Sequence, residues 1–114
     1  MEQVNRRQVW IAEPDPVVVG REQAGGRPVL VISSNDFNNT RAGLVVVLPI
    51  TTTERGFFSH VPVEPPEGGL RRKSFVMCEQ IKSMSKDRLQ RSLGEVRRET
   101  MIKVQEIVQV LLDL

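Results

Sequence analysis

The sequence predicts a mainly β fold of the α+β class: a small, strongly bent antiparallel sheet or partly open barrel that one C-terminal helix covers. Several short apolar segments are separated by turn-forming residues, and the apolar spacing changes to that of a helix only near the C-terminal end. A chain of 114 residues is long enough for one modest core. We therefore treat residues 1–114 as a single domain.

The first two predicted strands flank a long loop. Residues 8–12 (QVWIA) are apolar and end before two closely spaced prolines, which cannot donate hydrogen bonds to a sheet. Residues 17–26 are expected to form the loop, and residues 28–33 (PVLVIS) a strand rich in β-branched side chains. Residues 35–39 (NDFNN) suit a turn or a single helical turn.

The remaining predicted strands differ in how deeply they are buried. Residues 43–50 (GLVVVLPI) are apolar on both faces, which places them at the centre of the sheet. Residues 59–63 (SHVPV) contain a proline and suit an edge strand, which a turn at residues 65–69 (PPEGG) ends. Residues 74–81 (SFVMCEQI) predict a further strand.

The C-terminal segment, residues 98–114, predicts an amphipathic helix packed against the sheet. Its apolar side chains recur at three- and four-residue steps, at Met101, Val104, Ile107, Val108, Leu111 and Leu114. Its start lacks a capping side chain, because Arg97 and Arg98 stand where Ser, Asp or Asn would be favourable.

Composition limits the partners and the compartment. The formal net charge is only +2, yet basic residues cluster at positions 71–73, 86–91 and 97–98, which is typical either of a polyanion-binding surface or of solvated loops. The single cysteine cannot form an internal disulfide, the first residues do not resemble a signal peptide, and no apolar segment approaches the length of a membrane span. We expect a soluble, cytoplasmic protein with no membrane partner.

The sequence favours neither a metal site nor a bound cofactor. One cysteine and one histidine cannot supply the ligand cluster of a structural zinc site. The glycines at positions 20, 25 and 26 are not followed by the Lys-Ser or Lys-Thr of a nucleotide-binding phosphate loop.

Two side chains with reactive chemistry, His60 and Cys78, can each have a structural role instead. His60 follows Ser59 in the predicted edge strand, and it can be a hydrogen-bonded structural residue, a substrate contact, or a general acid or base. Cys78 lies within an apolar strand without a basic neighbour, so we predict a small core residue and not a nucleophile.

Arg27 and Thr51 are expected to lie on one rim of the sheet. Arg27 begins the second strand and Thr51 ends the third, and adjacent antiparallel strands bring such ends together. A guanidinium group is always charged and matches the geometry of phosphate. The alternatives are an ion pair between Arg27 and Glu22 that anchors the loop, and a turn-capping role for the Thr51 hydroxyl. These residues alone indicate a small β domain with a basic rim.

Six blocks of sequence together resemble the MazF/PemK family of toxin endoribonucleases over essentially the whole chain. They are QVWIAEPDP, VGREQAGGRPVLVIS, VVVLPITT, SFVMCEQIKSM, RLQRSLGEV and ETMIKVQEIVQVLLDL. The most specific parts are Gly-x-Glu-Gln-x-Gly-x-Arg-Pro at residues 20–28, Pro-Ile-Thr at 49–51, and Glu-Gln-Ile at 79–81 followed by Lys82.

The resemblance implies an SH3-like barrel with a C-terminal helix, a homodimer, and a toxin of a type II toxin-antitoxin system. Such a toxin is an mRNA interferase, which cleaves single-stranded RNA at a short sequence without metal or cofactor and leaves 2′,3′-cyclic phosphate and 5′-hydroxyl ends. A MazE-like antitoxin is the implied partner, with an acidic tail that occupies the RNA groove.

The resemblance also implies roles for individual residues. Arg27 and Thr51 would be catalytic, and Glu22, Gln23 and Gln80 would contact the substrate. As general base we take Glu22 as the first candidate and His60 as the second, which is a hypothesis separate from the resemblance. Contacts with RNA are expected from Gln23, Thr52, His60, Glu79 and Gln80. Sequence specificity is expected to depend on the loops at residues 52–59 and 65–73.

This chain differs from the family pattern at two places, and two other functions are alternatives to the nuclease. Relatives usually begin the first strand with Gly-Asp where this chain has Arg7-Gln8, and residues 17–19 make the approach to the loop one residue longer, which leaves the resting position of the loop open. The other functions are a gyrase-poisoning toxin with the same barrel and an RNA-binding module without chemistry. Arg27 with Thr51 favours the nuclease, because a gyrase binder needs no pair of residues facing a phosphate.

Overall fold

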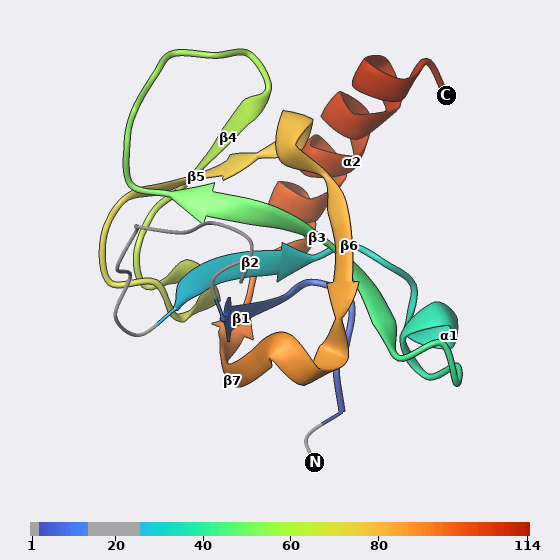
Figure 1. Cartoon of the computed structure of the whole chain (residues 1–114). Helices are drawn as coiled ribbons and strands as arrows, with labels where there is room; N and C mark the ends of the chain where they lie inside the picture. The colour runs from blue at the N-terminus through green and yellow to red at the C-terminus, as the bar shows by residue number, and fades with distance from the viewer. Residues whose placement is uncertain (1–2, 14–25) are drawn as a thin grey trace, which may run out of the picture.

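Seven strands and two helices make up the structure, a computed structural model that describes residues 3–13 and 26–114 (Figure 1). The strands are β1 (Gln8–Ala12), β2 (Arg27–Val31), β3 (Leu44–Thr51), β4 (His60–Val63), β5 (Ser74–Met77), β6 (Lys82–Ser85) and β7 (Leu89–Glu95). The helices are α1 (Asn35–Asn38) and α2 (Arg98–Leu112), and three 3₁₀ turns are η1 (Glu67–Gly69), η2 (Cys78–Gln80) and η3 (Lys86–Arg88). Neither helix of this part of the chain is long and apolar enough to cross a membrane.

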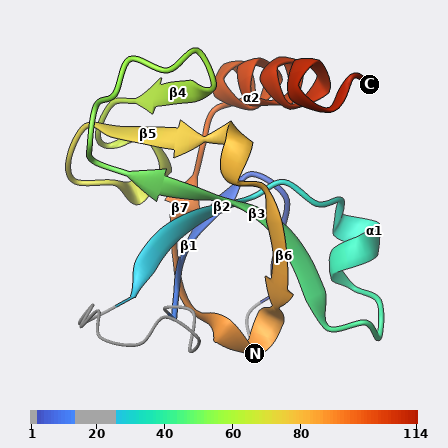
Figure 2. The same cartoon turned by 45° about the horizontal axis from the view of Figure 1, so that its top comes forward.

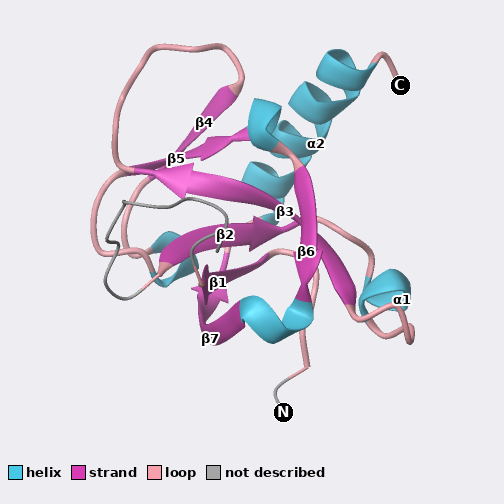
Figure 3. Ribbon diagram, viewed as in Figure 1, coloured by secondary structure: helices cyan, strands magenta, loops and turns pink. Residues whose placement is uncertain are grey.

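All strand pairs are antiparallel, and β3 is shared by two parts of the sheet. The order is β4-β5-β3-β2-β1-β7, and β6 also pairs with β3. One edge of β3 pairs with β2, while its other edge pairs first with β6, through Leu44–Val47, and then with β5, through Ile50 and Thr51. The strands curl around one another, and α2 lies against the end that carries β4 and β5 (Figures 2 and 3). The result is the bent, barrel-like antiparallel sheet with a terminal helix that the sequence predicts.

Alternating side chains of the central strands fill two separate cores. On one face, Val29 and Val31 of β2 and Val45 and Val47 of β3 pack with Trp10 inside the curled sheet. The other core lies beneath α2 and contains Val9, Leu30, Leu48, Ile50, Val61, Val63, Leu70, Val76, Cys78, Val96, Met101 and Val104. This two-sided burial confirms the prediction that the strand at residues 43–50 is central.

Both helices begin at side chains that accept hydrogen bonds from the backbone. Ser34 caps α1 by accepting a bond of 3.1 Å from the amide of Phe37. The start of α2 has no local cap, as the sequence predicts, but the carboxylate of Glu67 reaches it from η1. That carboxylate accepts bonds from the amide of Arg97 (2.9 Å) and from the hydroxyl of Thr100 (2.5 Å). A distant residue therefore supplies the missing cap.

The predicted strand at residues 74–81 is wrong in its second half. The strand ends at Met77, and the 3₁₀ turn η2 follows before β6 begins at Lys82. Because β5 and β6 pair with the same edge of β3 in registers that differ by three residues, η2 accommodates the additional length of chain. The strands β6 and β7 were not predicted from local pattern.

Candidate active site

Arg27 and Thr51 lie at the same end of two neighbouring strands. The pairing of β2 with β3 runs from Val31 to Val29, which is opposite Pro49, and Arg27 and Thr51 each lie two residues beyond that last pair. Residues two apart in a strand share a face, so both positions belong to the same face of the sheet. Arg27 is exposed and Thr51 half-buried. This end of the two strands is called the rim below.

The backbone before Arg27 is held by a close contact that requires glycine. Gly26 has φ +77°, and a Cβ there would lie 2.5 Å from the carbonyl oxygen of Ala12. Arg27 itself pairs with Ala12 of β1. The arginine therefore stands on a fixed part of the sheet, although the loop that leads to it lies outside the described residues.

The Thr51 hydroxyl has the turn-capping role that the sequence allowed. Its oxygen accepts a hydrogen bond of 3.1 Å from the amide of Thr53. A hydroxyl that accepts one bond still carries a hydrogen to donate, so this contact leaves Thr51 able to bind a phosphate oxygen.

Glu22 and Gln23 lie outside the residues that the structure describes, as does most of the predicted loop at residues 17–26. Of the other predicted RNA contacts, Thr52, Glu79 and Gln80 are exposed. Thr52 directly follows β3, whereas Glu79 and Gln80 project from η2.

Glu79 joins Ser59 and His60 in one hydrogen-bonded network. One carboxylate oxygen accepts a bond of 2.7 Å from the Ser59 hydroxyl, and the other lies 2.9 Å from Nε2 of His60. Burial alone would raise the pKa of Glu79, but the bonds from Ser59 and His60 outweigh it and hold that pKa below its ordinary value. Glu79 therefore carries its negative charge at neutral pH.

The His60 ring is enclosed by this network. Its side chain is only 3% exposed, and the ring of Phe57 packs edge-on against it at 5.1 Å. Nδ1 is buried and has no hydrogen-bond partner among the described residues. This burial does not favour direct contact between His60 and RNA, nor a role as general base, and it is consistent with the structural reading of this histidine.

Cys78 is a core residue, as predicted. It is 1% exposed in the core beneath α2, and burial together with the charge of Glu79 raises the pKa of its thiol to about 12. A thiol with that pKa stays protonated and unreactive at neutral pH.

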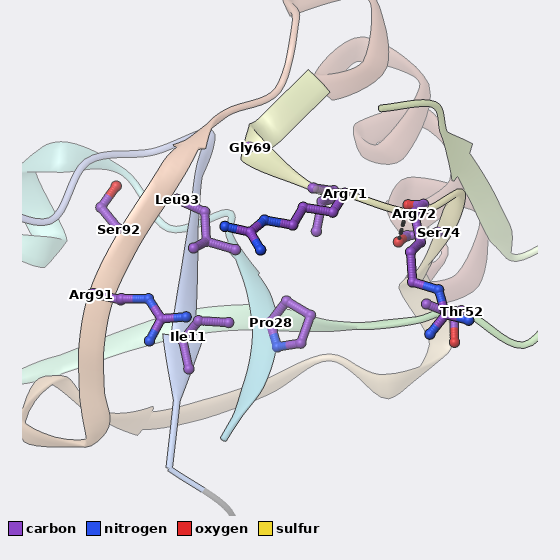
Figure 4. A pocket seen from close by; sticks show the side chains of 11 residues that line it. Ile11, Pro28, Thr52, Gly69, Arg71, Arg72, Ser74, Arg91, Ser92 and Leu93 are labelled. Atoms are coloured by element: carbon purple, nitrogen blue, oxygen red, sulfur yellow. Dashed lines mark hydrogen bonds between the residues drawn. The ribbon is translucent and has the colours of Figure 1, made fainter. Parts of the chain in front are cut away.

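A pocket of about 520 Å³, which no sequence pattern predicted, adjoins the rim on the opposite face of the strands. Pro28 and Thr52, the neighbours of Arg27 and Thr51, form part of its wall, and Arg71, Arg72 and Arg91 extend into or along it (Figure 4). It is called the basic pocket below. The only signal in the sequence is that these arginines belong to two of the basic clusters, at residues 71–73 and 86–91.

These groups suit the binding of an anion. A guanidinium and a hydroxyl at the rim can together hold one phosphate group through charge-assisted hydrogen bonds. Within residues 3–13 and 26–114, no group of three His, Cys, Asp or Glu side chains could hold a metal ion.

Comparison with known proteins points to one family. A sequence model described as PemK-like, MazF-like toxin of type II toxin-antitoxin system matches residues 5–112. The chain is 37% identical over 113 residues to Endoribonuclease EndoA of Bacillus subtilis, and the match covers 97% of this chain and 96% of the relative.

Solved structures agree with the sequence comparison. An endoribonuclease from a mycobacterial species, in complex with its cognate antitoxin, superposes with a TM-score of 0.78 at 30% identity and covers 97% of this chain and 96% of its own. The crystal structure of MazF from Deinococcus radiodurans gives a TM-score of 0.82 with full coverage of both chains, and at 23% identity this likeness concerns the fold alone.

Proposed function

The chain belongs to the PemK-like, MazF-like toxin family and is an endoribonuclease toxin, and from this premise we propose which RNA chemistry it performs and with which residues. We propose that it cleaves single-stranded RNA at a short sequence without a metal ion, leaving 2′,3′-cyclic phosphate and 5′-hydroxyl ends. The observation that carries the proposal is the family match together with an arginine and a threonine at one end of adjacent strands.

The reaction depends on geometry. The 2′-oxygen forms a bond to phosphorus while the bond from phosphorus to the 5′-oxygen breaks, and both oxygens must lie nearly in line. A base removes the 2′-proton, and the departing 5′-oxygen takes a proton from solvent. Since a stacked strand seldom adopts this arrangement, holding the RNA in it supplies much of the acceleration.

Arg27 is proposed to stabilise the charge that grows on the phosphoryl oxygens. A preorganised donor of this kind is worth about 3 to 4 kcal/mol in other enzymes. Arg27 cannot be the base, because a guanidinium keeps its proton above about pH 12. Thr51 is proposed to donate a hydrogen bond to a non-bridging oxygen while it accepts one from Thr53.

Glu22 is the proposed base, and the buried His60 is the weaker candidate. A carboxylate is a suitable general base, and Glu22 stands five residues before Arg27 in the sequence. Gln23, Thr52, Glu79 and Gln80 are proposed to contact RNA, with Ser59 and His60 acting through Glu79. Replacing Glu22 with Gln should flatten the acid side of the pH-rate profile, and an unchanged profile would exclude it.

The proposed partners follow from the relatives. One similar endoribonuclease was solved with its cognate antitoxin, so we propose that a MazE-like antitoxin with an acidic segment neutralises this toxin by covering the rim. We also propose a cytoplasmic homodimer in which residues 1–114 form one domain. No observation favours gyrase poisoning, since the curated relatives are endoribonucleases.

The test is cleavage of a long RNA in EDTA, with the new ends identified by sequencing and by their terminal chemistry. Wild-type protein should leave 2′,3′-cyclic phosphates at one short sequence. Arg27→Ala should lower kcat/KM by about 10²- to 10³-fold while the protein remains folded. The matched control is Arg41→Ala, which removes an exposed arginine before the opposite end of β3.

Three results would contradict the proposal. Cleavage that EDTA abolishes and magnesium restores would remove the metal-independent mechanism. Near-normal cleavage by folded Arg27→Ala would remove the role of this arginine. Inhibition of gyrase without any cleavage of RNA would favour the alternative function.

A further inference from the structure

We propose that the basic pocket is a second phosphate subsite, which binds the RNA backbone beside the scissile phosphate through Arg71, Arg72 and Arg91. This inference rests on the proposed function, because it concerns the same RNA. It assigns a specific role to three arginines, of which Arg71 and Arg72 belong to the loop at residues 65–73 and Arg91 to none of the predicted RNA-binding segments.

The pocket brings together side chains from distant parts of the chain. Arg71 and Arg72 follow η1, and Arg91 belongs to β7, which lies beside β1. In Figure 4, Arg71 reaches over Leu93 toward Pro28, Arg91 extends toward Ile11, and Arg72 extends toward Thr52. Their guanidinium groups thus line one hollow of about 520 Å³.

Among the described residues, no acidic side chain compensates the charge of the pocket, because none of the residues that line it is acidic. Within residues 3–13 and 26–114, no hydrogen bond or ion pair engages the guanidinium group of Arg71, Arg72 or Arg91. Like charges gathered in a hollow repel one another, and a bound anion would replace this repulsion with attraction.

The wall between the arginines suits a nucleotide. Ile11, Pro28, Leu70 and Leu93 supply an apolar surface against which a ribose or a base can pack, while Ser74 and Thr52 supply hydroxyls. A guanidinium fork binds two phosphate oxygens at once, so the arginines fit the charged part of the same ligand.

The position of the pocket favours RNA over an acidic peptide. Pro28 and Thr52 line it, and each is one residue from a proposed catalytic side chain, which is about 3.8 Å along the chain. Side chains of successive strand residues point to opposite faces, so the pocket and the catalytic pair lie on the two sides of one rim. A strand of RNA that is cut at the rim must continue past it, and the basic pocket adjoins that rim.

The test uses the double variant Arg71→Ala/Arg91→Ala and an RNA whose ribose at the cleavage site is 2′-deoxy, so that binding is measured without cleavage. Affinity is determined by fluorescence anisotropy over a range of salt concentrations. The slope of log K against log salt is negative, and each phosphate contact with single-stranded nucleic acid contributes about 0.7 to its magnitude. Loss of two contacts should therefore reduce the magnitude of the slope by about 1.4. Affinity at low salt should fall at least about tenfold.

Controls separate this effect from general loss of charge. The variant Arg41→Ala/Arg98→Ala removes the same number of exposed arginines elsewhere and should keep the wild-type slope. The variant Arg71→Lys/Arg91→Lys keeps the charge but loses the guanidinium fork, so it should retain most of the slope while binding more weakly.

The outcomes are distinguishable. An unchanged slope and affinity in folded Arg71→Ala/Arg91→Ala, while the wild-type protein still cleaves RNA, would overturn the subsite and leave the proposed function intact. Weaker binding of an oligoglutamate peptide with unchanged RNA binding would assign the pocket to an acidic peptide instead. Failure of the wild-type protein to bind or cut RNA would overturn both proposals.

Discussion

Two groups of arginines in this protein look alike in the sequence and differ in the structure. In the first group the guanidinium donates hydrogen bonds to acceptors within the described chain, and its members are Arg6, Arg7, Arg88 and Arg97. In the second group the guanidinium lines the basic pocket and makes no such bond there, and its members are Arg71, Arg72 and Arg91. The first group stabilises the fold, whereas the second is available to an anion.

The difference shows that a basic cluster in a sequence is not a functional unit. In the cluster at residues 71–73, Lys73 pairs with Glu64 at 3.4 Å, while its two neighbours line the pocket. In the cluster at residues 86–91, Lys86 donates to the carbonyl of Asn38 and Arg88 to that of Glu13. Internal acceptors, and not local charge density, separate structural from ligand-facing arginines.

The largest expected effect comes from removing the acceptor that holds Arg97. Glu67→Ala deprives the amide of Arg97 and the buried hydroxyl of Thr100 of their acceptor, so α2 loses its cap. We expect the free energy of unfolding to fall by about 2 to 3 kcal/mol in urea titrations. Glu64→Ala breaks an exposed ion pair and should cost less than about 0.5 kcal/mol. Equal losses in the two variants would contradict the capping role.

A smaller effect is expected at Arg7, which has φ +80° and donates to the carbonyl of Val96 at 3.1 and 2.9 Å. Arg7→Ala loses these bonds and keeps the unfavourable backbone conformation, so it should cost about 1 to 2 kcal/mol. Arg7→Gly loses the same bonds but relieves the conformation by about 1 kcal/mol, and its midpoint of thermal unfolding should exceed that of Arg7→Ala. The reverse order would mean that the positive φ carries no strain.

The dependence of stability on pH should be modest and should arise from the two carboxylates that accept hydrogen bonds, those of Glu67 and Glu79. Burial would raise the pKa of Glu67, but hydrogen bonds from Thr100 and Arg97 lower it overall, and the pKa of Glu79 is lowered in the same way. A carboxyl whose folded pKa lies below its unfolded value stabilises the fold fully above that unfolded value, here 4.5, and loses this contribution as pH falls through the folded value. Thermal unfolding should therefore show stability declining below about pH 4.5, and Glu67→Gln/Glu79→Gln should flatten this decline.

The smallest effect is expected for the pocket arginines. Arg71→Ala/Arg91→Ala removes no internal hydrogen bond among the described residues, so its free energy of unfolding should lie within about 0.5 kcal/mol of wild type. A loss of 2 kcal/mol or more, on the order of a capping residue, would move these arginines into the first group.

The parts of the fold with strong apolar patterns were predictable. The central strand β3 was expected from its continuous apolar segment, and α2 from its helical spacing. The strands β6 (KSMS) and β7 (LQRSLGE) were missed because most of their side chains are polar or half-exposed, so they carry no alternation. Their pairing with β3 and β1 is a property of the folded chain.

The candidate site, like the fold, has parts that the sequence predicts and parts that it does not. Antiparallel neighbours place Arg27 and Thr51 at one end, which follows from strand order alone. The basic pocket needs β7 beside β1 and the turn after η1 beside both, and no local pattern reports that arrangement. The network of Ser59, His60 and Glu79 was likewise not predictable, because it depends on the break in the strand at Cys78.

The sharing of β3 between two parts of the sheet has a consequence for how the molecule comes apart. Its backbone is bound along one side by β2 and along the other by β6 and β5, so its amides are protected only while both sides are closed. Partial melting of one half would strip partners from the strand on which the other half depends. We expect a single cooperative unit, in which the amides of Val45–Leu48 exchange with deuterium only when the entire molecule unfolds.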